Sequence, residues 1–123
     1  FMCNFNITEF SSYEYKVVIS TNPGLSVDIF DDIDTSNISS ETITLNSGPT
    51  ETKTFVSNID YIMDSDYYSS VIFDPYDLVT KYYVYVFVKD DYRVPNYNVE
   101  MSGFHQMGVR PEVSSIRFAN ILN

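Results

Sequence analysis

Residues 81–89 carry the most distinctive pattern of hydrophobic positions in the chain. They read Lys-Tyr-Tyr-Val-Tyr-Val-Phe-Val-Lys, so seven aromatic or β-branched residues stand between two lysines. Such side chains favour a pleated strand over a helix. Because successive residues of a strand point to opposite faces, two faces are predicted. One face would hold Tyr82, Val84, Val86 and Val88, and the other Tyr83, Tyr85 and Phe87. Neither face is polar, so we expect a central strand covered on both sides.

Shorter β-rich segments, separated by turn residues, fill the rest of the chain. Strands are predicted over residues 4–10, 13–21, 25–29, 41–46, 51–57, 67–73, 97–102 and 112–119. Residues 58–63 fit either a strand or a helical turn, and strand is preferred. Asn22-Pro23-Gly24 favours a turn, because proline fixes φ and glycine accepts positive φ. This turn predicts a hairpin of 13–21 with 25–29, and the turn at 47–50 predicts a second hairpin of 41–46 with 51–57.

Eight or nine short strands with no convincing helix indicate an all-β fold. We expect an antiparallel β-sandwich, either Ig-like or jelly-roll-like. A chain of 123 residues, of which 44 % are hydrophobic, can bury one core. We therefore expect a single domain over residues 1–123. Cys3 is the only cysteine, so an intrachain disulfide is impossible.

One run of residues resembles a known type of module. It consists of Asp74-Pro75 and Leu78, followed by Tyr82-x-Val84-x-Val86-x-Val88. This run is similar to the sixth strand of immunoglobulin-like and fibronectin-type modules, which carries a Tyr near its start and alternating valines. Two or more strands follow it here, where such modules usually have one, and the chain has no Cys-Trp-Cys framework. The resemblance covers about a dozen residues and implies a sandwich, an architecture that hosts many functions.

The charge balance excludes two classes of partner. Seven Lys and Arg stand against seventeen Asp and Glu, which gives a net charge of −10. Binding to nucleic acid or to an anionic membrane surface needs a basic patch, and none is visible. No stretch reaches the roughly 18 apolar residues of a transmembrane helix. We expect neither nucleic-acid binding nor membrane insertion.

One acidic cluster is a candidate metal site. Its residues are Asp28, Asp31, Asp32 and Asp34. Oxygen-rich loops of this kind can hold Ca²⁺, although this one lacks the glycine and the closing glutamate of an EF-hand. Residues 60–66 hold a second group of three aspartates. The alternative for both is a solvated acidic loop, and no other cofactor is expected.

No catalytic motif is present in the sequence. His105 is the only histidine, and it is distant in sequence from Cys3. One histidine and one cysteine cannot supply a zinc ligand set, and there is no Gly-x-Ser-x-Gly elbow or glycine-rich phosphate loop. A small hydrolase would have to use His105 or a carboxylate pair that nothing in the sequence singles out. We therefore expect a protein that is not an enzyme.

Aromatic residues are the most informative part of the composition. The chain has eleven Tyr and nine Phe. Tyrosine suits protein interfaces and sugar platforms, because it joins a large contact area to a polar tip. Tyr83, Tyr85 and Phe87 are the predicted contact residues, and a wide sandwich core is the alternative use of the aromatic side chains.

These observations lead to two hypotheses about function. The first is a non-enzymatic structural subunit of a large assembly, as a capsid, head-decoration, neck or tail component of a virus or phage particle. It would act through protein neighbours in a homo- or hetero-oligomer and would be located in the virion. The second is an extracellular or cell-surface adhesion or glycan-binding module, assisted by calcium.

Overall fold

The chain folds almost entirely into β-strands. The computed structural model describes residues 2–9, 11–36, 38–45, 50–58, 61–63, 70–72, 79–106 and 115–117. These contain nine strands and one 3₁₀ helix. The elements are β1 (Met2–Glu9), β2 (Tyr13–Ser20), η1 (Val27–Asp32), β3 (Ser39–Ile43), β4 (Glu51–Asn58), β5 (Tyr61–Met63), β6 (Ser70–Ile72), β7 (Lys81–Asp90), β8 (Tyr97–Gln106) and β9 (Ser115–Arg117). The all-β prediction is confirmed, and the single domain over residues 1–123 stays a prediction.

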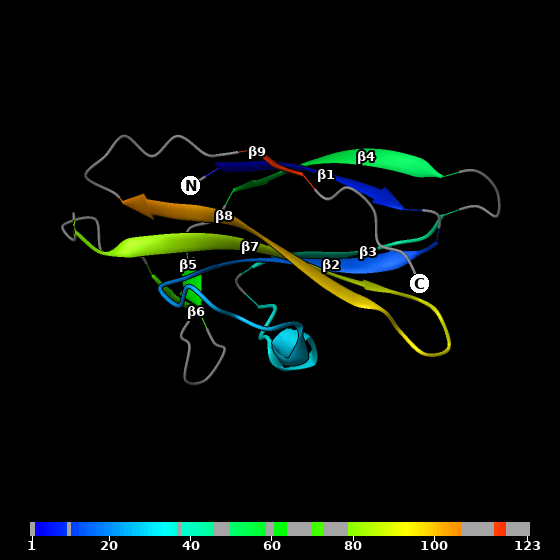
Figure 1. Cartoon of the computed structure of the whole chain (residues 1–123), viewed down its shortest axis with the longest axis horizontal. Helices are drawn as coiled ribbons and strands as arrows, with labels where there is room; N and C mark the ends of the chain where they lie inside the picture. Colours follow the sequence, from blue (N-terminus) through cyan, green and yellow to red (C-terminus); the bar gives the residue numbers. More distant parts are fainter. Residues whose placement is uncertain are drawn as a thin grey trace.

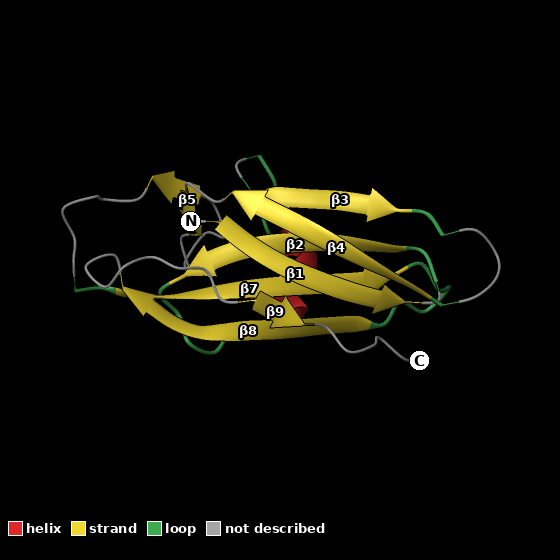
Figure 2. Cartoon of the chain, turned by 90° about the horizontal axis from the view of Figure 1, so that it is seen from above, coloured by secondary structure: helices red, strands yellow, loops and turns green. Residues whose placement is uncertain are grey.

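The strands form a sandwich. One sheet has the order β3-β2-β7-β8 and is antiparallel throughout, and a second has the order β4-β1-β9. Figure 1 shows the three-stranded sheet above the four-stranded sheet, with η1 and the small β5-β6 sheet below. Seen from above, β1 and β4 cross in front of the four-stranded sheet (Figure 2). The four-stranded sheet is therefore the middle layer.

Strand β7 is the centre of that middle layer, as the sequence predicts. It pairs with β2 on one side and with β8 on the other. The even-numbered side chains of β7 belong to the core between the two sheets. Its odd-numbered side chains Tyr85 and Phe87 pack against Phe30 of η1. A strand without a polar face is expected to be covered on both sides. The two clusters confirm this prediction for residues 81–89.

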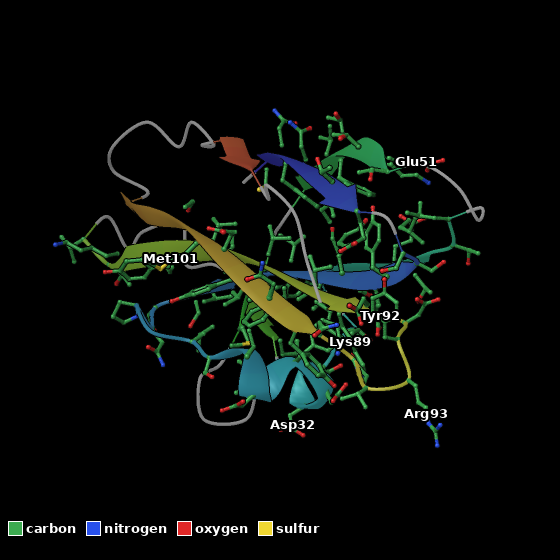
Figure 3. The ribbon with its side chains drawn as sticks, turned by 45° about the vertical axis from the view of Figure 1, so that its right-hand side comes forward. Asp32, Glu51, Lys89, Tyr92, Arg93 and Met101 are labelled. Carbon is green, nitrogen blue, oxygen red and sulfur yellow. The ribbon has the colours of Figure 1, made fainter. Side chains whose placement is uncertain are left out.

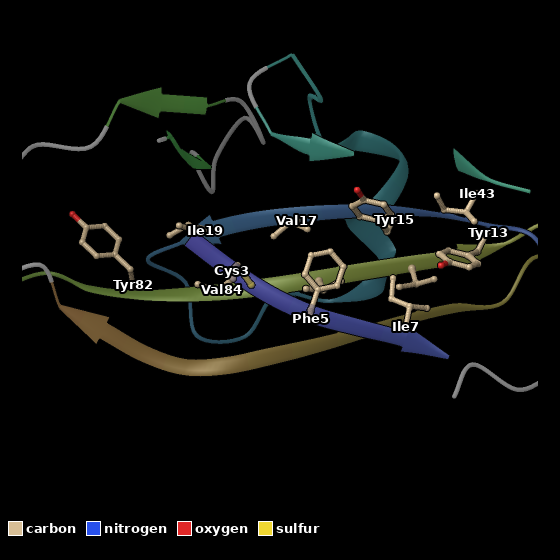
Figure 4. Close-up of a cluster of buried hydrophobic side chains, with 12 residues drawn as sticks. Cys3, Phe5, Ile7, Tyr13, Tyr15, Val17, Ile19, Ile43, Tyr82 and Val84 are labelled. Atoms are coloured by element: carbon tan, nitrogen blue, oxygen red, sulfur yellow. The ribbon is translucent and has the colours of Figure 1, made fainter. Parts of the chain in front are cut away.

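The inter-sheet core is built on an aromatic contact between the sheets. Phe5 of β1 lies 5.1 Å from Phe55 of β4 and 5.5 Å from Tyr15 of β2, measured between ring centroids. Cys3 and Ile7 flank Phe5 on the same strand, and all three are buried (Figure 4). Full burial of an aromatic side chain stabilises a fold by about 1.5–3 kcal/mol, so this contact is a main link between the layers.

The first predicted hairpin is wrong. Residues 25–29 do not form a strand beside β2, because both edges of β2 are taken by β3 and β7. Residues 27–32 form η1 instead. The side-chain oxygen of Ser26 accepts a hydrogen bond from the Asp28 amide at 3.3 Å, which caps the helix. Phe30 is the buried residue of η1, and Ile33, the extended residue that follows the helix, is buried as well.

The second predicted hairpin is also wrong. Strand β3 pairs with β2, with Ile43 opposite Tyr13, whereas β4 pairs with β1, with Phe55 opposite Phe5. The chain therefore crosses from one sheet to the other between β3 and β4. This crossing brings the apolar sides of β3 and β4 onto the same core.

Two smaller expectations are corrected at the end of the chain. Strand β8 runs on to Gln106, beyond the strand predicted over residues 97–102. Strand β9 pairs in parallel with β1, with Ile116 opposite Phe5, which makes the three-stranded sheet mixed. The predicted strand at 67–73 is represented by β6, paired with β5.

Candidate functional site

The predicted contact residues lie inside the protein. Tyr85 and Phe87 are buried beneath η1, in a cluster with Phe30 and Met63, and Tyr83 is half-buried beside them. The Tyr85 hydroxyl donates a 2.5 Å hydrogen bond to the Asn22 carbonyl oxygen. Tyr85 and Phe87 are therefore core residues rather than an exposed contact surface, because the chain covers this face with its own 3₁₀ helix.

A lysine is buried under the same helix. Lys16 of β2 is 5 % exposed, and its Nζ donates a 2.5 Å hydrogen bond to the Phe30 carbonyl oxygen. Burial is the largest cause that lowers the pKa of this ammonium group. Sequence reasoning missed Lys16, since a lysine between Tyr15 and Val17 looks like an outward-facing strand residue.

An ion pair ties η1 to the ends of β7 and β8. Asp31 accepts a 3.0 Å contact from the Lys89 ammonium group and a 3.0 Å hydrogen bond from the Tyr97 hydroxyl. The hydrogen bond from Lys89, and then that from Tyr97, lowers the pKa of Asp31. Figure 3 shows Lys89 beside η1, which also carries Asp32. The pair is largely exposed, so its contribution to stability is about 0–1 kcal/mol.

The candidate calcium ligands serve different purposes. Asp31 binds Lys89, while Asp34 accepts hydrogen bonds from the amide and hydroxyl groups of Ser36, which lower its pKa. Asp28 and Asp32 are exposed on η1. Among the described residues, no group of three or more His, Cys, Asp or Glu side chains is placed to hold a metal ion. The second acidic group, at 60–66, includes no aspartate among the described residues.

The two residues that a nucleophile and base pair would need, Cys3 and His105, both lie in strands. Cys3 is buried in the inter-sheet core, and burial raises the pKa of its thiol to about 11. A buried thiol of this kind is a poor nucleophile at neutral pH. His105 belongs to β8, where it is paired with Tyr82 of β7.

A small pocket opens where β2 begins and where β3 and β7 end. Its volume is about 260 Å³. The pocket combines hydroxyl, carboxylate and ammonium groups, and its lining residues are Ser12, Tyr13, Glu14, Thr42, Thr44, Lys89, Asp90 and Asp91. Asp90 is occupied in holding the β7–β8 turn, since it accepts 2.8 Å hydrogen bonds from the amide and side-chain nitrogens of Asn96. The remaining groups suit a small ligand rich in hydroxyl groups.

The outward positions of β1 and β4 form an uncharged surface. We call this surface the Asn/Thr face; it consists of Asn4, Asn6 and Thr8 of β1 and Thr52, Thr54 and Val56 of β4. The Thr8 and Thr52 hydroxyls are 2.8 Å apart, and the Thr54 hydroxyl donates a 2.7 Å hydrogen bond to Asn6 Oδ1. No described element lies over this face in Figure 1. In the sequence, the residues of this face show only an alternation of polar and apolar positions within each strand. The pairing of β1 with β4 brings them together into one surface.

Comparisons with known protein families, with curated proteins and with solved structures gave no match. Within the described part of the chain, no helix combines the length and the apolar character needed to cross a membrane.

Proposed function

We propose that this chain is a non-enzymatic structural subunit of a large assembly, acting through protein–protein contacts. The observation that supports this proposal is the Asn/Thr face. The chain carries a net charge of −10, yet the outward positions along the middle of β1 and β4 carry no charged residue. Charged residues are depleted at the centres of protein interfaces, and the Asn/Thr face shares this depletion.

The geometry of the face also favours contact with a protein. Two cross-strand hydrogen bonds, Thr8 to Thr52 and Thr54 to Asn6, hold four of its side chains in place. Side chains that are already ordered lose less conformational entropy when a partner binds. Val56 adds an apolar side chain that is 63 % exposed.

The assembly that we propose is a virus or phage particle, in which the chain would serve as a capsid, head-decoration, neck or tail component. This part of the proposal rests on the β-sandwich architecture alone, because subunits with this architecture are common in such particles. The architecture itself hosts many roles, so the argument is one of analogy.

Sedimentation of the native material tests the proposal. An extract from the natural source is fractionated on a density gradient under mild conditions, and the chain is followed by mass spectrometry. We expect it in fast-sedimenting fractions together with other structural proteins. Recovery of the chain only as a free species near its 14.2 kDa mass would contradict the proposal.

The pocket supports a second candidate function, an extracellular adhesion or glycan-binding module assisted by calcium. Ser12, Thr42 and Thr44 offer hydroxyl groups, and Glu14 offers a carboxylate, for hydrogen bonds to sugar hydroxyls. A panel of monosaccharides, with and without Ca²⁺, should then raise the melting temperature of the wild type, because a ligand that binds only the folded state stabilises it. Glu14→Gln should abolish the rise, and a panel without any effect on the wild type would remove this candidate.

A further inference from the structure

We propose that the pocket at the start of β2 binds an amino sugar, a ligand that joins a primary ammonium group to neighbouring hydroxyl groups. This inference rests on the second candidate function, glycan binding, and names the class of sugar that the pocket selects. Sugars can be neutral, anionic or cationic, so the charge of the lining decides between the classes. The choice is carried by the charge balance of the lining and by a row of side chains across three strands.

The charged groups of the lining favour a cation. The lining holds the carboxylates of Glu14, Asp90 and Asp91. Its ammonium group, that of Lys89, lies 3.0 Å from a carboxylate oxygen of Asp31 on η1, which offsets its charge. A lining that is acidic overall attracts a cationic ligand and repels an anionic one. The net charge of −10 on the chain acts in the same direction.

Glu14 is the carboxylate best placed for an ammonium group. It lies opposite Lys89 in the pairing of β2 with β7, an arrangement in which oppositely charged side chains usually interact. The Lys89 ammonium group contacts Asp31 instead, and within the described part of the chain Glu14 forms no ion pair. Asp90, by contrast, is held by the two nitrogens of Asn96. The Glu14 carboxylate is therefore available to a cation from outside the chain.

Hydroxyl groups lie beside this carboxylate. Thr42 is opposite Glu14 in the pairing of β3 with β2, so Thr42, Glu14 and Lys89 form a row across three strands on one side of the sheet. Thr44, just after the end of β3, also lines the pocket, and both threonines are exposed. Their hydroxyls can donate to a sugar hydroxyl or accept from it. A simple amine would leave these groups unused, whereas an amino sugar meets both the carboxylate and the hydroxyls.

The size of the pocket fits one sugar ring. Its volume is about 260 Å³. Pockets for drug-sized ligands begin at roughly 300 Å³, so this one is matched to a smaller molecule. We therefore expect a single ring to fill it, and a monosaccharide is a sufficient probe of its selectivity.

Nuclear magnetic resonance titration of the isotope-labelled protein with three probes tests the inference. The probes are glucosamine, glucose, which lacks the ammonium group, and butylamine, which lacks the hydroxyl groups. At slightly acidic pH we expect glucosamine to bind about tenfold more tightly than either of the others, because hydrogen bonds to charged groups are the stronger ones. The amide signals of Glu14 and Thr42 should shift, and the preference should weaken as salt is raised, because salt screens the charges of an open pocket.

Glu14→Gln separates charge from shape. It keeps the size of the side chain and removes its charge, so the affinity for glucosamine should fall about tenfold, to the level of glucose. Glu100→Gln is the matched control, since Glu100 is exposed on β8 and lies outside the pocket lining, and it should leave the affinity unchanged. Thr42→Val should weaken the binding of glucosamine and leave that of butylamine as it is. Melting curves establish that each variant folds, which is expected at surface positions.

Several outcomes would overturn the inference. They are glucose or butylamine that binds as tightly as glucosamine, and a loss with Glu14→Gln that Glu100→Gln reproduces. If none of the three probes binds but other monosaccharides raise the melting temperature, the preference for an amino sugar is refuted and glycan binding stands. If no sugar has any effect, both fall, and the proposed structural role, which sedimentation tests, is untouched.

Discussion

The ammonium group of Lys16 lies 4.3 Å from the centroid of the Phe30 ring and donates a hydrogen bond to the carbonyl oxygen of the same residue. One side chain of β2 thus contacts both the backbone and the ring of the residue that η1 buries. A cation over an aromatic face is worth about 2 kcal/mol when water is excluded. The contact fixes η1 over the apolar face of β7, at the cost of a buried charge.

This relationship predicts losses of different size for two substitutions of Lys16. Lys16→Ala removes the donor to the Phe30 carbonyl and leaves a cavity, so unfolding in urea should become easier by about 2–4 kcal/mol. Lys16→Met keeps the volume and removes the buried charge, and its effect should stay below about 1.5 kcal/mol in either direction. Equal losses for the two variants would show that the ammonium group, which both variants lack, governs the site rather than the cavity.

The Asp31–Lys89 pair predicts a dependence of stability on pH. Because the folded-state pKa of Asp31 is lowered, the pair contributes stability above the unfolded pKa of about 4 and loses it as the pH falls through the lower folded value. The advantage of the wild type over Asp31→Asn should be at most about 1 kcal/mol near neutral pH, since the pair is largely exposed. It should shrink as the pH falls below about 4, as urea titrations at several pH values would show.

Lys89→Met provides the matching control for that titration. It removes the partner of Asp31, so the double variant with Asp31→Asn should show little further loss. Additive losses would mean that the two side chains do not act as a pair.

The position of Cys3 predicts a thiol that reacts only when the protein opens. Burial between the sheets raises its pKa to about 11, so the thiol stays protonated at pH 8 and is inaccessible to reagents. Iodoacetamide should modify the native protein very slowly, and the rate should rise steeply through the urea transition. Rapid labelling of the native protein would contradict the placement of β1 over the core.

The stacked pair of Phe5 and Phe55 predicts an order of sensitivity to truncation. Phe5 is fully buried, so Phe5→Ala should cost about 3–5 kcal/mol in a urea or thermal unfolding experiment. Phe55 is half-buried at the edge of the sheet, and Phe55→Ala should cost about 1–3 kcal/mol. The reverse order would show that β4 rather than β1 carries the core of the three-stranded sheet.

The elements with the strongest local pattern were predictable from sequence. Residues 81–89 alternate with two apolar faces, and both faces are buried as this pattern requires. Residues 25–29 were wrongly predicted to be a strand because Leu25, Val27 and Ile29 alternate with polar residues, whereas η1 begins at Val27 and buries Phe30. A short apolar run supports both periods, and the tertiary structure decides between them.

The pairing of the strands could not be predicted from the sequence, for a different reason. Ile43 and Phe55 both face the core, and a local hairpin between their strands would satisfy the same hydrophobic pattern as the observed pairs with Tyr13 and Phe5. The choice depends on contacts between distant segments. The same limit explains the candidate sites: Tyr85 and Phe87 look available until η1 covers them, and the Asn/Thr face exists only once β1 and β4 lie side by side.

The parallel pairing of β1 with β9 has a consequence for how the chain is made. Ile116 lies opposite Phe5, so one edge of the strand that carries the inter-sheet core is paired by residues that are synthesised long after β1 itself. Contacts between such distant positions form slowly, because a long loop has to close before they give any stabilisation. On the ribosome, that edge of β1 stays open to other strands until residues 115–117 emerge, and this is the period in which the nascent chain most needs protection from aggregation.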